Sequence, residues 1–249
     1  MKVRRALVIP DCHIPYEDKK AYGLMLEVAK DARPDEIVIL GDYADFYAVN
    51  FHGKNPDKNY LLLDEIDAVT ARLRELRQLF PDARIVFLEG NHEYRLARYI
   101  AANCRELFGI LSVPQLLNLA AYGIDFVPYG PNQKHYVLGS KLIARHEPLG
   151  GGVHCAYQSV VKAQHSVIFG HTHRIQEHQI VSIAGENYRG ISAGWLGDKD
   201  AEVMGYVKNH HQWALGFCLV TVLPDGLWFN QLIHIIEGKA LVDGHLWEA

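Results

Sequence analysis

Short apolar runs alternate with longer amphipathic segments in the N-terminal part of this 249-residue chain, and this alternation constrains the fold more than any other feature. Three apolar runs, at residues 3–9, 36–40 and 84–88, predict buried strands. Between them, residues 19–31 and 60–80 place apolar side chains at helical spacing, which predicts two amphipathic helices. Strands that alternate with helices in this way predict a parallel sheet with right-handed crossover connections.

The C-terminal half has the pattern of antiparallel hairpins instead. Residues 135–146 predict one hairpin with its turn at 139–140, and residues 217–236 predict a second hairpin. Between the two hairpins, residues 154–164 predict a helix and residues 166–169 predict a short strand. The chain should therefore contain both parallel and antiparallel strands.

The composition is that of an ordinary globular protein, with 49% hydrophobic and 22% charged residues. No linker or internal repeat divides the chain, so we expect one domain over residues 1–249, an α/β fold of two packed mixed sheets with helices outside. The formal net charge of −4 argues against a general electrostatic attraction to nucleic acid, although a local basic strip is compatible with it.

The N-terminus has no pattern of an export signal. The apolar run at residues 6–9 is too short for the core of a signal peptide, and no stretch approaches the length of a membrane span. The four cysteines lack the C-x-x-C spacing of a zinc knuckle or redox pair. We therefore expect a cytoplasmic protein with reduced thiols and no membrane partner.

Polar side chains follow five of the expected strands, at the point where each strand ends. They are Asp11, His13, Asp42, Asn91, His146, His171 and His173. Because the carboxyl ends of strands in an open α/β sheet converge on one crevice, these side chains should meet there. Asp11 and His13 are two residues apart, as are His171 and His173, so in extended chain each pair should project to one side.

This set offers oxygen and nitrogen ligand atoms and no thiolate, which suits manganese, iron or zinc. Seven ligands are too many for one closed tetrahedral site, but they suit two ions that share a bridging carboxylate. Two divalent ions against the charges of Asp11 and Asp42 leave a positive surplus that would attract an anion such as phosphate.

The ordered motifs "DCH", "GDYAD", "GNHE", "RH" and "GHTH" resemble those of the calcineurin-like metallophosphoesterase superfamily, in particular its small bacterial and bacteriophage members. The resemblance extends from Asp11 to His173. It implies a four-layer α-β-β-α sandwich and hydrolysis of a phosphoester with two divalent metal ions. Manganese is the expected metal, with iron and zinc as alternatives.

The resemblance also implies a role for each motif residue. One metal ion would be bound by Asp11, His13, Asp42 and His173, and the other by Asp42, Asn91, His146 and His171. Asp42 would therefore bridge the two ions. His92 would face the phosphate and the leaving group, and Asp45 would orient it. Asn91, His92 and Arg95 are the candidate substrate contacts, and the alternative for Arg95 is a solvated surface charge on the expected helix.

Two departures from the family pattern bear on the substrate. Phe46 and Tyr47 stand where protein Ser/Thr phosphatases have Arg-Gly, so that phosphate clamp is missing. Glu147 follows His146 where many relatives have glycine. We expect phosphodiesters of nucleotides or nucleic acid as substrates. The alternatives are a phosphomonoesterase or protein phosphatase, and a metal-loaded scaffold without catalysis.

Several features have no assigned role. The sequence leaves open whether the chain forms a homo-oligomer, what Glu147 does, and whether His52 overhangs the site. The glycines at 150–152 lack the Lys-Ser/Thr of a P-loop and are expected to form a flexible rim. The remaining expectation is that the tryptophans lie in the core or in an interface: Trp195, Trp213, Trp228 and Trp247.

Overall fold

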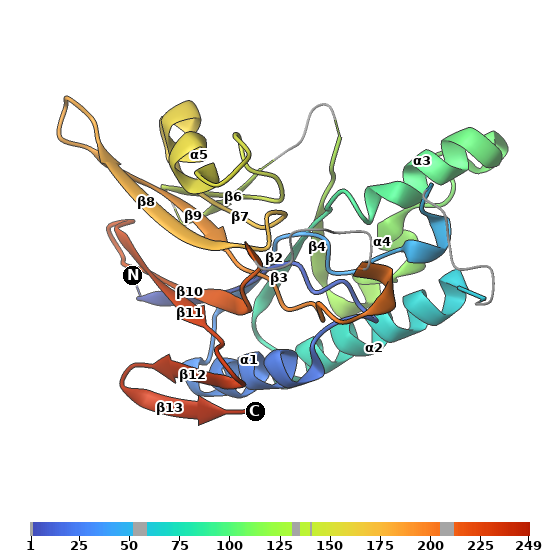
Figure 1. The fold of residues 1–249 in the computed structure, drawn as a ribbon, viewed down its shortest axis with the longest axis horizontal. Helices are drawn as coiled ribbons and strands as arrows, with labels where there is room; N and C mark the ends of the chain where they lie inside the picture. Colours follow the sequence, from blue (N-terminus) through green and yellow to red (C-terminus); the bar gives the residue numbers. More distant parts are fainter. Residues whose placement is uncertain (1, 52–58, 131–134, 140, 205–211) are drawn as a thin grey trace.

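The expected alternation of strands and helices builds the first of two sheets. The computed structural model describes residues 2–51, 59–130, 135–139, 141–204 and 212–249 (Figure 1). The strand order of the first sheet is β11-β10-β1-β2-β3-β4. Its strands are β1 (Arg4–Ile9), β2 (Glu36–Ile39), β3 (Arg84–Leu88), β4 (Ile124–Val127), β10 (Gly216–Val222) and β11 (Trp228–His234). Strands β1 to β4 are parallel, and β10 and β11 add an antiparallel edge.

The second sheet has the order β5-β6-β7-β9-β8 and is also mixed. Its strands are β5 (Tyr136–Leu138), β6 (Leu142–Arg145), β7 (Ser166–Phe169), β8 (Ile175–Val181) and β9 (Asn187–Ala193). β6, β7 and β9 run parallel, and β5 and β8 are antiparallel edge strands.

The side-chain alternation of the first sheet explains why the two sheets pack face to face. Ala6 and Val8 of β1 lie in an apolar cluster shared with Leu142 and Ile168 of the second sheet. Leu7, between them, points to the other face and lies in the cluster under the helices. Successive strand residues face opposite sides, so a strand buried on both faces reads as a continuous apolar run.

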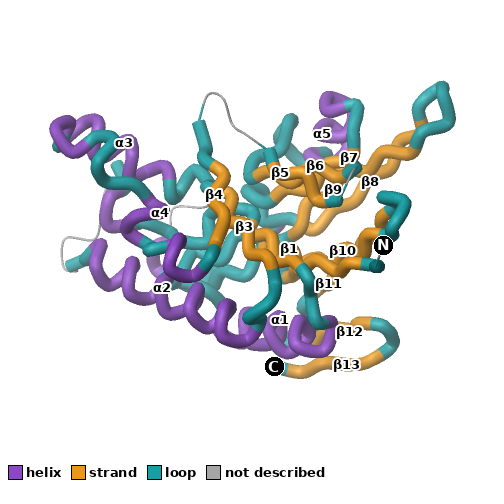
Figure 2. Tube along the Cα trace, turned by 180° about the vertical axis from the view of Figure 1, so that it is seen from behind, coloured by secondary structure: helices purple, strands orange, loops and turns teal. Residues whose placement is uncertain are grey.

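Helices cover the outer faces of both sheets (Figures 1 and 2). α1 (Lys19–Ala32) and α2 (Leu62–Leu79) pack on the first sheet, and α5 (Cys155–Ala163) packs on β7, β8 and β9 of the second. The Asp18 carboxylate caps α1 by accepting hydrogen bonds from two backbone N–H groups of its first turn. The resulting order of layers is helix, sheet, sheet, helix.

Shorter elements complete the fold. The helical ones are η1 (Tyr47–Val49), α3 (Tyr94–Asn103), η2 (Arg105–Leu107), α4 (Val113–Leu116), η3 (Leu119–Tyr122) and η4 (Glu202–Met204). Strands β12 (Lys239–Val242) and β13 (His245–Glu248) form a separate hairpin beside α1 (Figure 2). No helix in the described part of the chain is long and apolar enough to cross a membrane.

The four-layer α-β-β-α architecture expected from the sequence is confirmed, and β1, β2, β3, α1, α2, α5 and β7 begin and end within two residues of their expected limits. Both expected hairpins are present, although Ser140 of the first turn lies outside the described residues. The sequence did not indicate β4, the long β8–β9 pair or the β12–β13 hairpin. That the chain forms one domain stays a prediction.

Candidate metal centre

The seven candidate ligands lie on loops at the carboxyl ends of β1, β2, β3, β6 and β7, as the sequence predicted. The expectation that the Asp11–His13 and His171–His173 segments are extended is wrong. His13, His171 and His173 have φ values of 54°, 63° and 56°, in the left-handed region. Such strained backbone conformations are concentrated at functional sites, where the surrounding structure enforces them.

Backbone hydrogen bonds join the loops to one another. The N–H groups of Cys12 and His13 both donate to the Asp42 carbonyl oxygen, at 3.0 and 2.9 Å. The His171 N–H donates to the Asp11 carboxylate at 2.8 Å, and the His92 N–H donates to Asp42 Oδ1 at 2.8 Å. Each acidic candidate ligand is thereby fixed by a loop from a different strand.

Two motif glycines are required by close packing at the site. A Cβ atom at Gly90 would collide with the Asp42 carboxylate, and a Cβ atom at Gly170 would collide with the Asp11 carboxylate. Both carboxylates are almost fully buried. The "GN" and "GH" dipeptides, which follow β3 and β7, therefore leave room for the carboxylates that follow β2 and β1.

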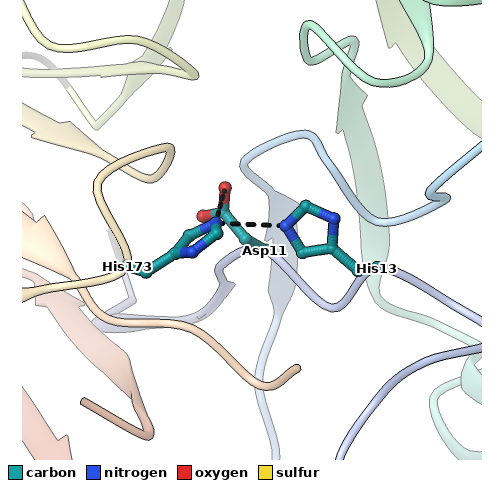
Figure 3. Close-up of side chains that lie close together, drawn as sticks. All are labelled: Asp11, His13 and His173. Atoms are coloured by element: carbon teal, nitrogen blue, oxygen red, sulfur yellow. Dashed lines mark hydrogen bonds and ion pairs between the residues drawn. The ribbon is translucent and has the colours of Figure 1, made fainter. Parts of the chain in front are cut away.

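The first cluster consists of Asp11, His13 and His173, whose ligand atoms lie within 4.8 Å of one another (Figure 3). The His13 Nδ1 atom pairs with the Asp45 carboxylate at 2.9 Å, which assigns the proton to Nδ1 and leaves Nε2 facing His173 Nε2 at 3.1 Å. Burial lowers the pKa of His173 to about 4 despite the adjacent Asp11 carboxylate. A neutral, buried imidazole beside a carboxylate suits a divalent metal ligand.

The second cluster consists of Asp42, Asn91, His146 and His171. His146 Nδ1 donates to the Leu40 carbonyl oxygen at 2.9 Å, so Nε2 carries a lone pair. The His146 Nε2 atom lies 2.9 Å from Asn91 Oδ1 and 3.3 Å from Asp42 Oδ2, and both oxygens are acceptors. His171 Nδ1 lies 2.7 Å from the same Asn91 oxygen.

These converging acceptor atoms need a donor or a cation among them, either a proton on an imidazole nitrogen or a metal ion. Burial disfavours the charged form of His146, but the Asp42 carboxylate outweighs it and raises the pKa of His146 to about 10. The Asp42 carboxylate therefore favours a positive charge at this position, whether a proton on the imidazole or a metal ion. The donor set of each cluster fits manganese, iron or zinc.

Asp42 lies between the two clusters. Its carboxylate belongs to the grouping with His146 and His171, and its ligand atom also lies within 4.8 Å of those of His13 and His92. This is the position that a bridging carboxylate requires. The same grouping brings His92 within reach of a metal ion, so geometry alone does not separate His92 from the ligands.

Asp45 connects His92 to the first cluster. One carboxylate oxygen, Oδ2, lies 2.9 Å from His13 Nδ1 and 3.2 Å from His92 Nδ1. Burial would raise the pKa of the Asp45 carboxyl, but the charge of His92 and the hydrogen bonds with both histidines hold it well below its usual range. Asp45 is therefore an ionised acceptor for both imidazoles.

Arg95 completes this group. Its Nη1 donates to the Asp45 carbonyl oxygen at 2.9 Å and to Asp45 Oδ1 at 3.0 Å, and its Nη2 lies 3.0 Å from His92 Nε2. The arginine side chain is only 12% exposed. The alternative of a solvated surface charge is thus wrong, although a substrate contact stays a prediction.

The sequence did not single out Glu93, the last residue of "GNHE". Its buried carboxylate accepts hydrogen bonds from the N–H groups of Asp42, Ala44 and Gly90, at 2.9, 2.8 and 2.9 Å. Burial, followed by the charge of Asp42, raises the pKa of Glu93 to about 7. Glu93 ties the Asp42 loop to the Asn91 loop, and its place in the motif was the available signal.

Tryptophans at the first cluster were also missed. Trp195 is buried, as expected, but its ring stacks on His173 with the centroids 4.8 Å apart and the planes 14° apart. Trp213 is half-buried, and its ring meets the His173 ring edge to face with the ring centroids 4.4 Å apart. Trp228 is buried in the apolar cluster between the sheets, and Trp247 is half-buried against the cluster under the helices.

The glycine loop at residues 150–152 and Glu147 both have polar contacts in the structure. Arg174 hydrogen-bonds to the Gly152 carbonyl and to Gln212, so it holds the glycine loop to the body of the protein. Tyr129 donates to Glu147 at 2.5 Å beside the second cluster. His52 lies outside the described residues.

Three comparisons place the chain among known proteins. A family model described as calcineurin-like phosphoesterase matches residues 4–175. The Gene 54 proteins of Mycobacterium phages L5 and D29 are each 28% identical to this chain, over 98% of it and 99% of their own length.

Solved structures with a similar fold have low sequence identity. Vacuolar Protein Sorting 29 from Cryptosporidium parvum has 13% identity and a TM-score of 0.47, over 98% of this chain and 94% of that chain. Yfce, a phosphoesterase from E. coli, has 16% identity and a TM-score of 0.43, over 92% and 98% of the two chains.

Proposed function

This chain belongs to the calcineurin-like phosphoesterase family, as its motifs predicted, and from that premise we propose that it hydrolyses phosphodiesters of nucleotides or nucleic acid with two divalent metal ions. The observation that carries the proposal is the pair of ligand clusters that meet at Asp42, with His92 beside them. We propose manganese as the metal, with iron or zinc as alternatives.

The ligand roles follow the two clusters. We assign Asp11, His13 and His173 to one ion, Asn91, His146 and His171 to the other, and Asp42 to both. When bound, the ions would supply Lewis acidity and neutralise charge on the phosphoryl group. The chain itself fixes where they bind, through the Asp45 and Leu40 oxygens that orient His13 and His146.

His92 is the proposed general acid for the leaving oxygen. Its Nδ1 is anchored to Asp45, and its Nε2 points to the side where Arg95 lies. A proton delivered from Nε2 would convert a poor leaving group into an alcohol. In the structure Arg95 Nη2 donates to this nitrogen, so Nε2 must take up a proton before it can act as an acid. Arg95 would then donate to a phosphoryl oxygen instead.

The electrostatics of the site favour a diester over a monoester. A monoester dianion needs strong bidentate donors, and Phe46, at the position of the phosphatase arginine, is buried and apolar. The Arg95 charge is already compensated by Asp45. A diester carries a single negative charge, which the small positive surplus of two metal ions can balance.

A substrate panel tests the class. Protein reconstituted with manganese should cleave bis-nitrophenyl phosphate faster than the mono-nitrophenyl ester, and it should degrade single-stranded DNA or small nucleotides in a reaction that salt suppresses. A preference for the monoester with intact DNA would support the phosphomonoesterase or protein phosphatase alternative. Absence of hydrolysis with both metals bound would support a scaffold.

A further inference from the structure

Five aromatic side chains gather on the side of the site where the first cluster and Asp45 lie. We call Tyr16, Tyr47, Tyr60, Trp195 and Trp213 the aromatic cluster. The ring centroids of Tyr47 and Tyr60 are 4.7 Å apart, those of Tyr16 and Tyr47 are 6.3 Å apart, and those of Trp195 and Trp213 are 4.6 Å apart. Three different loops therefore bring aromatic rings to one place.

The aromatic cluster borders the catalytic groups directly. Trp213 contacts His173, and the Tyr16 N–H donates to the His13 carbonyl oxygen at 2.7 Å. Tyr47 follows Asp45 by two residues, in η1, which packs against α3, the helix of Arg95. Burial and then the charges of neighbouring groups, Asp45 among them, raise the pKa of the Tyr47 hydroxyl.

Four of the five rings keep part of their surface uncovered. Tyr16, Tyr47, Tyr60 and Trp213 are each half-buried, in contrast to the buried Trp195 behind them. The Tyr60 hydroxyl oxygen is buried and has no hydrogen-bond partner among the described residues. The uncovered parts of these rings match a planar heteroaromatic group, which stacks on aromatic side chains.

We propose that the aromatic cluster is a subsite for a nucleobase, on the side of the phosphate where His92 protonates the leaving oxygen. This inference rests on the proposed function, and it specifies a nucleobase on the leaving-group side of the scissile bond. Tyr47, which stands where protein phosphatases have the glycine after their clamp arginine, then distinguishes a nucleotide site from a phosphoprotein site. Base stacking tolerates any sequence, because every base has an aromatic face.

Steady-state kinetics with dinucleoside monophosphates tests the subsite. One substrate carries both bases, and two analogues each lack one base but keep the sugar. Loss of the base on the leaving-group side should lower kcat/KM of the wild-type protein roughly ten- to hundred-fold. The ratio to follow is kcat/KM of the substrate with both bases divided by kcat/KM of the analogue that lacks the base on the leaving-group side. Tyr47→Leu should bring this ratio close to one, and Tyr47→Phe, which keeps the ring, should keep it at the wild-type value.

Tyr157→Leu is the matched control. Tyr157 is an exposed tyrosine of α5, outside the aromatic cluster, so its replacement should leave the ratio at the wild-type value. Equal kcat/KM values for all three substrates with the wild-type protein would overturn the subsite and leave the phosphodiesterase proposal intact. An unchanged ratio in both Tyr47→Leu and Trp213→Leu would overturn it as well.

A binding measurement separates this inference from the proposed function. Titration with the dinucleoside monophosphate should quench tryptophan fluorescence in a saturable way, and the abasic analogue should quench it much less. Tyr47→Leu should weaken the binding roughly ten-fold or more. If no phosphodiester is hydrolysed but this pattern holds, the subsite stands and the proposed function falls. If the two ligands quench alike, the subsite is wrong whatever the activity.

Discussion

The Asp45 Oδ2 atom lies 3.2 Å from the His92 Nδ1 atom, so the proposed acid is anchored to a carboxylate. The same oxygen lies 2.9 Å from His13 Nδ1, on a candidate metal ligand. One buried side chain therefore contacts both a candidate ligand and the proposed acid. A change at Asp45 should disturb metal binding and proton transfer together, whereas a change at His92 should disturb proton transfer alone.

His92→Ala should keep both metal ions and lower the rate by roughly a hundred- to ten-thousand-fold, because a general acid is lost. The loss should be smaller for nitrophenyl leaving groups, which depart without a proton, than for alkyl ones. Rates and metal content measured on the same preparation check this. Equal losses for both leaving groups would remove the acid assignment, and loss of metal would make His92 a ligand.

Asp45→Asn should weaken one of the two metal sites by roughly ten- to a hundred-fold, because His13 loses the acceptor that fixes its ring and tautomer. It should also lower the rate at saturating metal. Calorimetric titration of metal-free protein with manganese would resolve the two sites. Two unchanged affinities would show that the contact with His13 does not orient a ligand.

Asp42→Asn should lose metal content and nearly all activity, because Asp42 is the carboxylate placed between the clusters. Asp64→Asn, at an exposed position in the first turn of α2, is the control and should retain both ions. Elemental analysis gives the readout. Wild-type stoichiometry in Asp42→Asn would count against the bridging role.

Glu65 predicts a pH dependence of stability. Burial, together with the charge of Asp45, raises its pKa from 4.5 to about 7 in spite of hydrogen bonds from the Tyr47 and Ala48 N–H groups. The unfolded chain therefore ionises at lower pH than the folded protein. The contribution of Glu65 to the free energy of unfolding is complete below about pH 4.5 and falls by up to about 3 kcal/mol as the pH rises to about 7.

Glu65→Gln cannot ionise, so this part of the pH dependence should disappear from the variant. Denaturant unfolding of both proteins between pH 4 and 8 gives the difference in free energy. The wild type should lose stability relative to the variant across that range, and a constant difference would contradict the assignment.

The sequence predicted that the candidate ligands would meet, because they follow the strands directly. Asp11, Asp42, Asn91 and His146 each lie within a few residues of a buried apolar run, and parallel strands bring such positions to one edge. The left-handed turns at His13 and His173 were not predictable, because they depend on hydrogen bonds to other loops.

Contacts between distant segments set the rest. Glu93 accepts hydrogen bonds from Asp42 and Ala44, which lie about fifty residues away along the chain, so its local pattern was only that of a helix start. Strand β8 is exposed along most of its length and carries few apolar residues, which left it without a strand signal. The aromatic cluster combines rings that are far apart in the sequence.

The central claim is that two metal ions at these clusters make the protein a phosphodiesterase, and a manganese titration of metal-free protein tests it most directly. The measurement is the initial rate of bis-nitrophenyl phosphate hydrolysis against the number of bound manganese ions per chain. We predict negligible hydrolysis without metal, a rate that rises to a plateau at two ions per chain, and loss of that rate with a chelator. A protein that binds two ions and still fails to hydrolyse the diester, or one that is fully active without metal, would contradict the claim.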